Sequence, residues 1–132
     1  SNRWSGTVKS ADGTSGKVET DQGLSMSFSA GAGQTIRDGD KVEIFVRPEF
    51  IRAVRSSEAD QAVTEGDNQM SGVIDSLLFN GANSRVLVRT GSGELIESDV
   101  TVTGNNDLKP GEDVRLIWSS RQAMCFARSE SA

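Results

Sequence analysis

The chain has 132 residues, of which 14 are basic and 19 acidic, with no histidine and one cysteine. This length fits one domain, or two small halves that share a core. Without histidine the chain lacks the commonest general base and zinc ligand, and one cysteine cannot form an intrachain disulfide; histidine-dependent hydrolases and zinc fingers are therefore excluded. A net charge of −5 argues against a generic nucleic-acid-binding domain, which usually carries a basic face. A lone cysteine fits a reducing, cytoplasmic setting.

The first predicted strand opens a repeat that returns half a chain later. Residues 2–8 (NRWSGTV) and 68–74 (NQMSGVI) share an Asn, a large apolar residue, Ser-Gly and a β-branched residue, at an offset of 66. Residues 36–46 (IRDGDKVEIFV) match residues 108–118 (LKPGEDVRLIW) at an offset of 72. We interpret the matches as an internal two-fold repeat whose second half has six extra residues in a surface connection. The alternative is two unrelated β-meanders with similar turns.

Two glycine-containing segments of the first half resemble nucleotide-binding loops but lack the required residues. Residues 11–18 (ADGTSGKV) have Ala where a phosphate-binding loop needs its first glycine, and Lys17 is not followed by a hydroxyl residue. This segment is therefore predicted to be a hairpin turn. Residues 31–33 (GAG) lack the third glycine and following helix of a dinucleotide-binding motif, so they are predicted to be a loop. Between these segments, residues 24–29 alternate apolar and serine side chains, which predicts a strand.

The two long predicted strands, residues 42–46 and 114–118, each follow an acidic turn. Gly39 and Gly111 occupy equivalent positions of these turns, and Pro before Gly is typical of a type II turn. The acidic residues are Asp38, Asp40, Glu112 and Asp113. Paired carboxylates can bind calcium or act as an acid and a base, but recurrence of the same turn in both halves favours exposed turn residues.

Arg47 and Glu49 end the first long strand in the sequence Arg-Pro-Glu. Arg47 can hold an anion or the neighbouring Glu49 in a fixed geometry, so both are candidate ligand-contact or domain-contact residues; the alternative is a structural turn. Cys125 lies in the last apolar run and is predicted to be a small core or edge residue. The seven aromatic residues are predicted to lie mostly in the core. They are Trp4, Phe28, Phe45, Phe50, Phe79, Trp118 and Phe126.

Short strands with turn residues between them predict an all-β fold, built as two intertwined OB-fold-like small barrels from the repeat. Residues 1–55 form the first OB-like repeat, residues 56–69 a polar linker with at most one helical turn, and residues 70–128 the second repeat. Residues 85–89 and 94–97 form a hairpin around the Gly-Ser-Gly turn at 91–93. The halves are expected to share a core or exchange a strand, because one small barrel alone buries little surface.

Residues 42–51 (VEIFVRPEFI) resemble the TOBE domain, the C-terminal regulatory region of ATP-binding-cassette importer ATPases. In that family a strand ending in Arg-Pro-Glu is followed by a short apolar segment. The openings at residues 2 and 68, the stretch 72–81 and the ending 110–118 are also similar, so the resemblance covers most of the chain. It implies a paired OB-like barrel, with Arg47 and Glu49 at the matching Arg-Pro-Glu.

The resemblance further implies a non-catalytic regulatory or dimer-stabilising domain of a solute importer's ATP-binding subunit, of the polyamine, iron or sugar type and closest to polyamine. The chain is then a fragment and not itself an enzyme, without a cofactor; ATP and magnesium belong to the nucleotide-binding domain outside it. Expected partners are that domain, a second copy of the ATPase subunit and, indirectly, the membrane subunits, with no nucleic acid. The location is cytoplasmic, at the inner face of the membrane. The alternative is a module that binds an oxyanion or other solute through Arg47, as in related molybdate-handling barrels.

Overall fold

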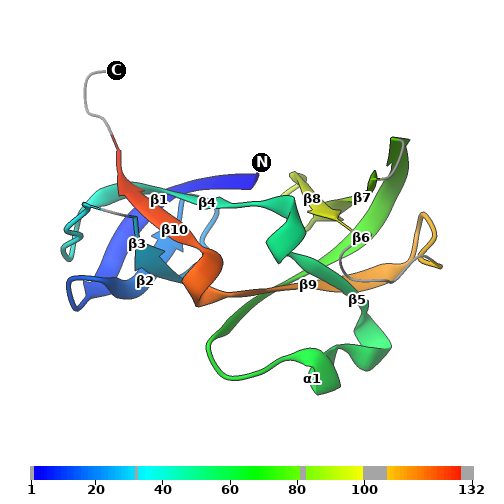
Figure 1. Ribbon diagram of the computed structural model, residues 1–132, viewed down its shortest axis with the longest axis horizontal. Helices are drawn as coiled ribbons and strands as arrows, with labels where there is room; N and C mark the ends of the chain where they lie inside the picture. Colours follow the sequence, from blue (N-terminus) through cyan, green and yellow to red (C-terminus); the bar gives the residue numbers. More distant parts are fainter. Residues whose placement is uncertain (1, 32, 81–82, 100–106, 129–132) are drawn as a thin grey trace. The chain divides into compact units, whose positions relative to one another are not determined.

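The computed structural model describes residues 2–31, 33–80, 83–99 and 107–128. Within them the chain forms strands joined by tight turns and single-turn helices (Figure 1). The strands are β1 (Asn2–Ala11), β2 (Ser15–Thr20), β3 (Ser25–Ala30), β4 (Lys41–Val46), β5 (Arg52–Arg55), β6 (Asp67–Asn80), β7 (Asn83–Thr90), β8 (Leu95–Asp99), β9 (Asp113–Ser119) and β10 (Met124–Ala127). The helices are η1 (Pro48–Phe50), η2 (Ser56–Glu58), α1 (Ala59–Ala62) and η3 (Ser120–Gln122). The predicted all-β fold is confirmed. No helix in the described ranges has the length and apolar character needed to span a membrane.

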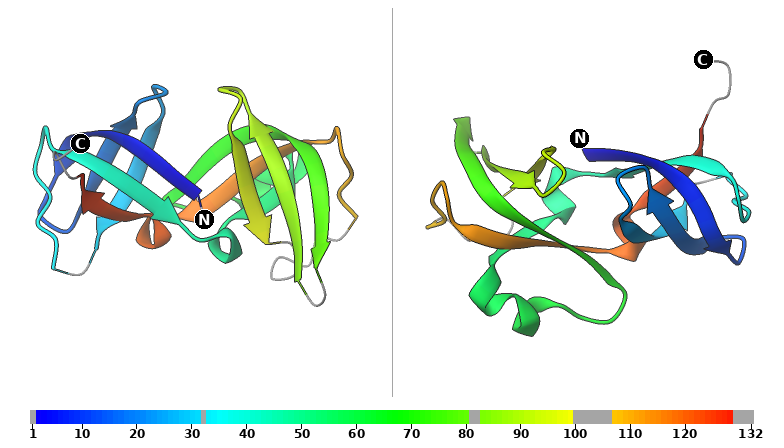
Figure 2. Two further views of the ribbon diagram at one scale, coloured as in Figure 1. Left: turned by 90° about the horizontal axis from the view of Figure 1, so that it is seen from above. Right: turned by 180° about the vertical axis from the view of Figure 1, so that it is seen from behind.

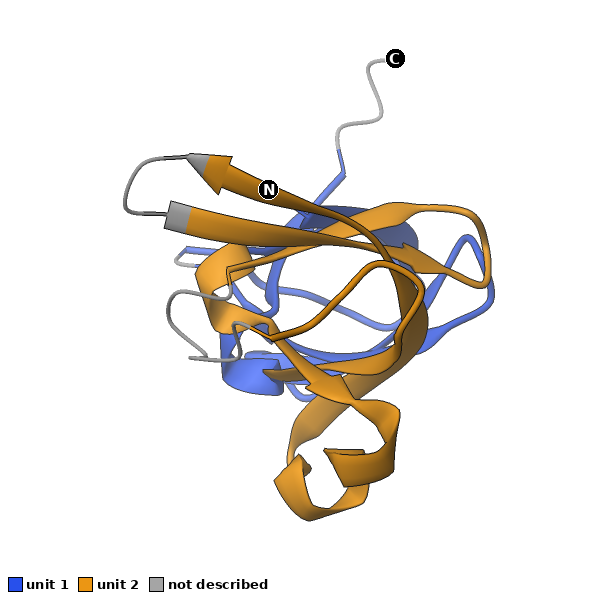
Figure 3. Ribbon diagram, turned by 90° about the vertical axis from the view of Figure 1, so that its right-hand side faces the viewer, with its two compact units in different colours: residues 1–46, 119–132 blue, residues 47–118 orange. Residues whose placement is uncertain are grey.

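Unit 1 comprises residues 1–46 and 119–132, blue in Figure 3. It forms a closed five-stranded barrel. Its strand order is β1-β2-β3-β10-β4, and β4 pairs with β1 to close the barrel. Neighbouring strands are antiparallel except β10 and β3, which run parallel with Met124 opposite Ser29. Alternate side chains of each strand point inward. The core includes Trp4, Val8, Val18, Met26, Phe28, Val42, Ile44 and Cys125.

Unit 2 comprises residues 47–118 and contains a five-stranded sheet in the order β5-β9-β6-β7-β8. The strands β6, β7 and β8 form an antiparallel ribbon (Figure 2, left). Its core includes Met70, Ile74, Val86, Val88, Ile96, Val114, Leu116 and Trp118. Buried Ser98 donates a hydrogen bond through its hydroxyl to the carbonyl oxygen of Ile51 at 2.6 Å, which satisfies a polar group inside this core.

The two repeats exchange their last strands. The strand β5 is the last strand of the first repeat but pairs with β9 in unit 2, with Ala53 opposite Leu116. The strand β10 is the last strand of the second repeat but lies between β3 and β4 in unit 1, with Cys125 opposite Ile44. The predicted intertwined pair of barrels is therefore confirmed. Because each repeat completes the other's sheet, the two compact units do not coincide with the two sequence repeats.

The turns before β4 and β9 are copies of one another. Gly39 donates its N–H to Val8, and Gly111 donates to Ile74, each at 2.8 Å. Their φ angles are +84° and +89°, which a type II turn requires at its third residue. The strand that accepts each glycine N–H also has a bulge at an equivalent place. The bulge comes after Val8 in β1 and after Ile74 in β6. The predicted repeat and its turns are therefore confirmed down to single hydrogen bonds.

The six extra residues of the second half lie in two places. Val8 pairs with Val18 ten residues later, whereas Ile74 pairs with Val88 fourteen residues later. Four of the extra residues therefore lengthen the hairpin of β6 and β7, and the other two lie between β8 and β9. The prediction that all six form a surface connection was wrong, because an extended hairpin satisfies its backbone hydrogen bonds as it grows.

Residues 56–66 connect β5 to β6 through η2 and α1. Arg115 donates from Nη1 to Asp60 Oδ1 at 2.8 Å, and Arg52 donates from Nη2 to the carbonyl oxygen of Ala62 at 2.9 Å. Ala59 is fully buried. A helical turn, which the sequence allowed in the linker but did not require, forms here, and two arginines from the sheet of unit 2 hold it in place.

The aromatic residues divide between core and surface. Trp4, Phe28 and Trp118 are buried. Phe45 and Phe126 form an edge-to-face pair on the outside of unit 1, with ring centroids 5.8 Å apart. Phe50 and Phe79 are exposed, Phe79 to 76%. The prediction that most aromatic rings lie in the core was therefore wrong, because strand alternation does not show which faces are covered.

Candidate functional site

The candidate residues Arg47 and Glu49 lie in the segment that carries the chain from β4 to β5. Pro48 is buried and starts η1, where its missing N–H costs nothing. The carbonyl oxygen of Arg47 accepts the N–H of Phe50 at 3.0 Å. Arg47 is exposed and Glu49 half-buried, and no hydrogen bond or ion pair joins either side chain to another described residue. The structure therefore gives this segment a turn geometry and leaves the Arg47 guanidinium facing solvent.

The second repeat has a matching segment that sequence reasoning missed. The helix η3 carries the chain from β9 to β10, and Ser119 caps it by accepting the N–H of Arg121 at 3.2 Å. At the offset of 72, Arg121 occupies the position of Glu49, so the charge at this position is opposite in the two segments. The repeat offset of 72 predicts a matching segment at this place. It was missed because residues 119–121 (SSR) differ from Arg47-Pro48-Glu49 in both sequence and charge.

A cluster around Arg55 joins the exchanged strand β5 to the turn before β9. Arg55 donates from Nε to Glu112 Oε1 at 2.8 Å and from Nη2 to the carbonyl oxygen of Asp107 at 3.0 Å. Glu112 also accepts the backbone N–H of Lys109. The Arg55 guanidinium and then the Lys109 amide hold the pKa of Glu112 below its ordinary value. This cluster fixes a strand from one repeat to a turn of the other.

Three of the four acidic turn residues, Asp38, Asp40 and Glu112, accept backbone N–H groups of the described chain. Asp40 accepts the N–H of Arg37 at 3.0 Å, and at the equivalent place in the second turn Glu112 accepts the N–H of Lys109. Asp38 accepts the N–H of Ala11 at 2.8 Å. In the described ranges, no three acidic, histidine or cysteine side chains gather in a way that suits a metal ion. The arrangement favours the turn interpretation of these carboxylates.

The hairpin turn predicted within residues 11–18 lies at residues 12–14, between the end of β1 and the start of β2. The carboxylate of Asp12 accepts the N–H of Ser15 at 3.0 Å and its hydroxyl at 3.1 Å. These hydrogen bonds lower the pKa of Asp12. An acidic side chain occupies the loop centre, which makes the loop unsuited to a phosphate. The predicted loop at residues 31–33 includes Ala32, which lies outside the described residues.

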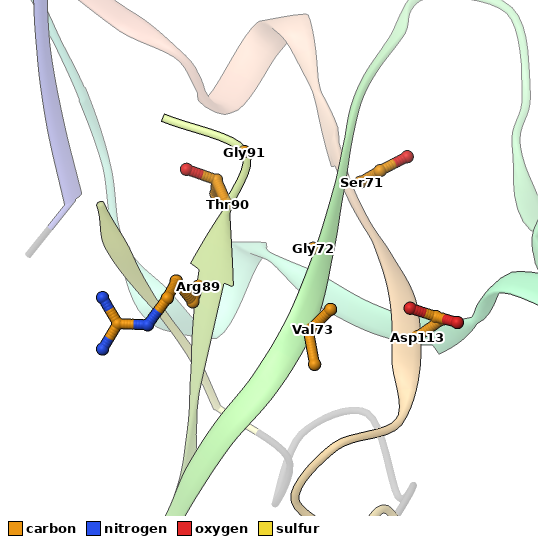
Figure 4. A pocket seen from close by; sticks show the side chains of 7 residues that line it. All are labelled: Ser71, Gly72, Val73, Arg89, Thr90, Gly91 and Asp113. Atoms are coloured by element: carbon orange, nitrogen blue, oxygen red, sulfur yellow. The ribbon is translucent and has the colours of Figure 1, made fainter. Parts of the chain in front are cut away.

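A shallow hollow of about 350 Å³ lies on unit 2 where β6, β7 and β9 meet (Figure 4). Its lining residues are Ser71, Gly72, Val73, Arg89, Thr90, Gly91 and Asp113. Gly91 contributes no side chain. The Arg89 guanidinium points away from Val73, because it donates hydrogen bonds to Asp75 Oδ1 at 3.1 Å and to the carbonyl oxygen of Gly93 at 3.2 Å. The space therefore has an apolar side at Val73 and a carboxylate at Asp113. Sequence analysis assigned Asp113 and Gly91 to turns and did not predict that they meet.

Cys125 is fully buried in unit 1, as predicted. Burial raises the pKa of its thiol to about 12. A protonated, enclosed thiol is a core group and not a nucleophile.

The region that contains both exchanged strands also carries a family signature. A family model for the TOBE domain matches residues 44–126, from within β4 to within β10. The chain belongs to the TOBE domain family. The match includes Arg47 and Glu49, the cluster around Arg55 and the hollow on unit 2.

Two known proteins resemble this TOBE chain over nearly its whole length. It is 28% identical over 120 residues to the spermidine/putrescine import ATP-binding protein PotA of Rubrobacter xylanophilus (strain DSM 9941 / JCM 11954 / NBRC 16129 / PRD-1). That match covers 90% of this chain but 29% of the relative, so the chain spans less than a third of that protein. The crystal structure of the cytoplasmic molybdate-binding protein ModG with molybdate bound superimposes with a TM-score of 0.77. The superposition covers 96% of both chains at 15% sequence identity, which shows a common fold.

Proposed function

We propose that this TOBE chain is a regulatory and dimer-stabilising domain of the ATP-binding subunit of a solute importer, of the polyamine type. The observation that carries the proposal is the similarity to a spermidine/putrescine import ATP-binding protein over 90% of the chain. On this proposal the partners are the nucleotide-binding domain of the same subunit, a second copy of that subunit and, through them, the membrane subunits. The domain would then act on the cytoplasmic side of the membrane, and ATP and magnesium would bind outside it.

The described residues support a binding role. The buried Cys125 is held protonated, and the carboxylates of Asp38, Asp40 and Glu112 accept backbone N–H groups. What the surface offers is an exposed Arg47, a hollow with a carboxylate and exposed apolar side chains on unit 2. Such groups recognise a partner, and a partner shifts a conformational equilibrium by its differential affinity for the two states.

A domain deletion tests the proposal in the full ATP-binding subunit. Removing residues 4–128 is expected to leave ATP binding in place and to weaken subunit pairing and solute uptake, because contact surface between the copies is lost. Uptake of spermidine and pairing by sedimentation are the measurements. Arg47→Ala in the intact subunit tests whether the residue before η1 contributes to pairing and uptake. Arg3→Ala, at an exposed arginine of β1, is its control. Unchanged pairing, uptake and regulation after the deletion would contradict the proposal.

A second candidate function is binding of a small solute within this domain. The fold likeness to a protein crystallised with molybdate motivates it. The hollow on unit 2 does not suit an oxyanion, since Asp113 lines it and Arg89 is already paired with Asp75; the exposed Arg47 suits an anion better. Calorimetric titration with molybdate, tungstate, sulfate and spermidine tests this function. Heat with an oxyanion that Arg47→Ala abolishes supports it, and no heat with any of the four rejects it.

A further inference from the structure

Exposed apolar side chains concentrate on one unit of the chain. Among the described residues, the large hydrophobic side chains with the greatest exposure are Phe50, Val73, Leu78, Phe79 and Leu95, at 40 to 76%. All five belong to unit 2. A monomeric protein scatters single apolar residues over its surface, whereas their concentration on one part marks an interaction site.

Strand register places three of these residues on one face of the sheet. Val73 lies opposite Arg89, and Arg89 lies opposite Leu95, so the three form a row across β6, β7 and β8. Leu78 lies on the same side, opposite Arg85. The row between them contains the half-buried Leu87, opposite Ser76 on β6 and Glu97 on β8. We call the side of β6–β8 that carries Val73, Leu78, Leu87 and Leu95 the apolar face.

The first repeat provides an internal control for the apolar face. By register, the row equivalent to Val73, Arg89 and Leu95 in unit 1 is Thr7, Glu19 and Ser25. The row equivalent to Ser76, Leu87 and Glu97 is Ser10, Lys17 and Ser27. The same strands in the same fold are thus polar on this side in unit 1. Folding alone does not require the apolar residues of unit 2, which leaves recognition as their use.

The extended hairpin enlarges the apolar face. Three residue pairs of β6 and β7 have no counterpart in the shorter hairpin of unit 1: Leu78 with Arg85, Phe79 with Ser84 and Asn80 with Asn83. Leu78 is 47% exposed and Phe79 76%. Adjacent residues of a strand point to opposite sides, so this part of the hairpin offers apolar contacts on both.

The charges on the apolar face are paired with one another. Arg85 donates to Glu97 at 2.7 Å, and Arg89 donates to Asp75 at 3.1 Å. With both signs present and neutralised, the face does not select a polyanion or an acidic membrane surface. A surface that carries apolar groups and both charge signs in alternation can match a second copy of itself across a two-fold axis.

We propose that the apolar face of β6–β8 is the surface through which this domain docks onto a second copy of itself. This rests on the proposed function, in which two ATP-binding subunits work as a pair. Three strands spaced about 4.8 Å apart and some seven residues long offer a few hundred Å², roughly half or less of the 800 Å² per partner of a standard interface. The contact is therefore weak for the isolated chain and becomes effective where other parts of the subunits raise its effective concentration.

Sedimentation of the isolated chain measures the association directly. At concentrations up to about 1 mM, a weak dimer is expected in reversible exchange with monomer. Val73→Thr with Leu95→Ser gives the face the residues that unit 1 has at these positions. This double variant is expected to associate at least roughly tenfold more weakly than the unchanged chain. Phe50→Gln is the matched control, because it replaces an exposed apolar residue of unit 2 by its repeat equivalent outside the face. Thermal unfolding verifies that each variant is folded.

Thiol crosslinking identifies the occupant in the full ATP-binding subunit. Val73→Cys is expected to give a crosslinked pair of subunits with a short bifunctional maleimide, while Thr7→Cys, its equivalent in unit 1, is not; the buried Cys125 does not compete. A strictly monomeric chain together with no crosslinked pair overturns the inference, as does a Val73→Cys product joined to a membrane subunit. The deletion of residues 4–128 tests the proposed function separately. Unchanged pairing, uptake and regulation after that deletion would reject the proposed function, whereas a dimer of the isolated chain through this face would still stand.

Discussion

Replacing Gly6 by alanine is expected to destabilise the chain, because a side chain at this position has no space. Gly6 lies opposite Thr20 in the hairpin of β1 and β2. A Cβ atom there would lie 2.5 Å from the carbonyl oxygen of Glu19, 2.6 Å from Cγ1 of Val18 and 3.0 Å from Cα of Thr20. Two of these neighbours are backbone atoms within a paired strand, so they cannot rotate away.

The size of the effect follows from these distances. Ordinary contact of a Cβ atom begins near 3.4 Å, so β1 and β2 must move apart by about 1 Å at this point. Overpacking of this kind costs about 1–3 kcal/mol, and the lower backbone freedom of unfolded alanine returns about 0.5–1 kcal/mol. A net loss of about 1–2 kcal/mol corresponds to a midpoint about 4–8 °C lower for a chain of this size.

Thermal and urea unfolding followed by circular dichroism measure this loss. Gly72→Ala tests the second copy of the motif, where a Cβ atom would meet Cγ1 of Val88 and lie 2.9 Å from the carbonyl oxygen of Arg89. Gly91→Ala is the control, since nothing lies within 4 Å of its added Cβ. If Gly6→Ala unfolds at the wild-type midpoint, the packing argument for the Ser-Gly motif is wrong.

Three further outcomes are expected. Arg55→Met is expected to lower stability near neutral pH, because it removes the pairing of Arg55 with ionised Glu112. The folded pKa of Glu112 lies below its ordinary 4.5, so the stability that this pairing contributes is present above pH 4.5 and disappears as the pH falls through the lowered value. Thermal midpoints from pH 7 to pH 3 measure it, and an identical pH profile for Arg55→Met contradicts it. Cys125 is expected to resist a thiol reagent at pH 8 until urea unfolds the chain, and rapid labelling of the native chain would show that its enclosure is wrong. Since each unit contains a strand of the other repeat, Trp4→Phe and Trp118→Phe variants are expected to report the same urea midpoint by fluorescence; two separate midpoints would show independent units.

Much of the local structure could be predicted from the sequence because its causes are local. Alternating side chains predicted β3, and Gly39 and Gly111 predicted turns whose positive φ angles the structure confirms. The Ser-Gly motif at Gly6 and Gly72 predicted the repeat. Each of these signals depends on a few neighbouring residues, for which strand alternation or one glycine conformation decides the outcome.

Of the candidate site, the sequence provided residues but not their neighbours. It singled out Arg47, and the structure shows this residue exposed beside a buried Pro48. It did not predict that Arg55 reaches Glu112, 57 residues away, or that Gly91 and Asp113 line one hollow. Contacts over such separations depend on sheet order, which the alternation within a strand does not encode.

The sequence by itself determined the strands, the turns, the two-fold repeat and the TOBE resemblance, since each depends on the types and spacing of a few neighbouring residues. Only the tertiary structure decided that β5 and β10 exchange places and that four extra residues extend a hairpin. It also decided that Val73 and Leu95 stand exposed where the first repeat has Thr7 and Ser25. The physical reason is the same in each case: a strand pattern specifies two faces, and only the packed chain determines which strand pairs with which and which face is covered.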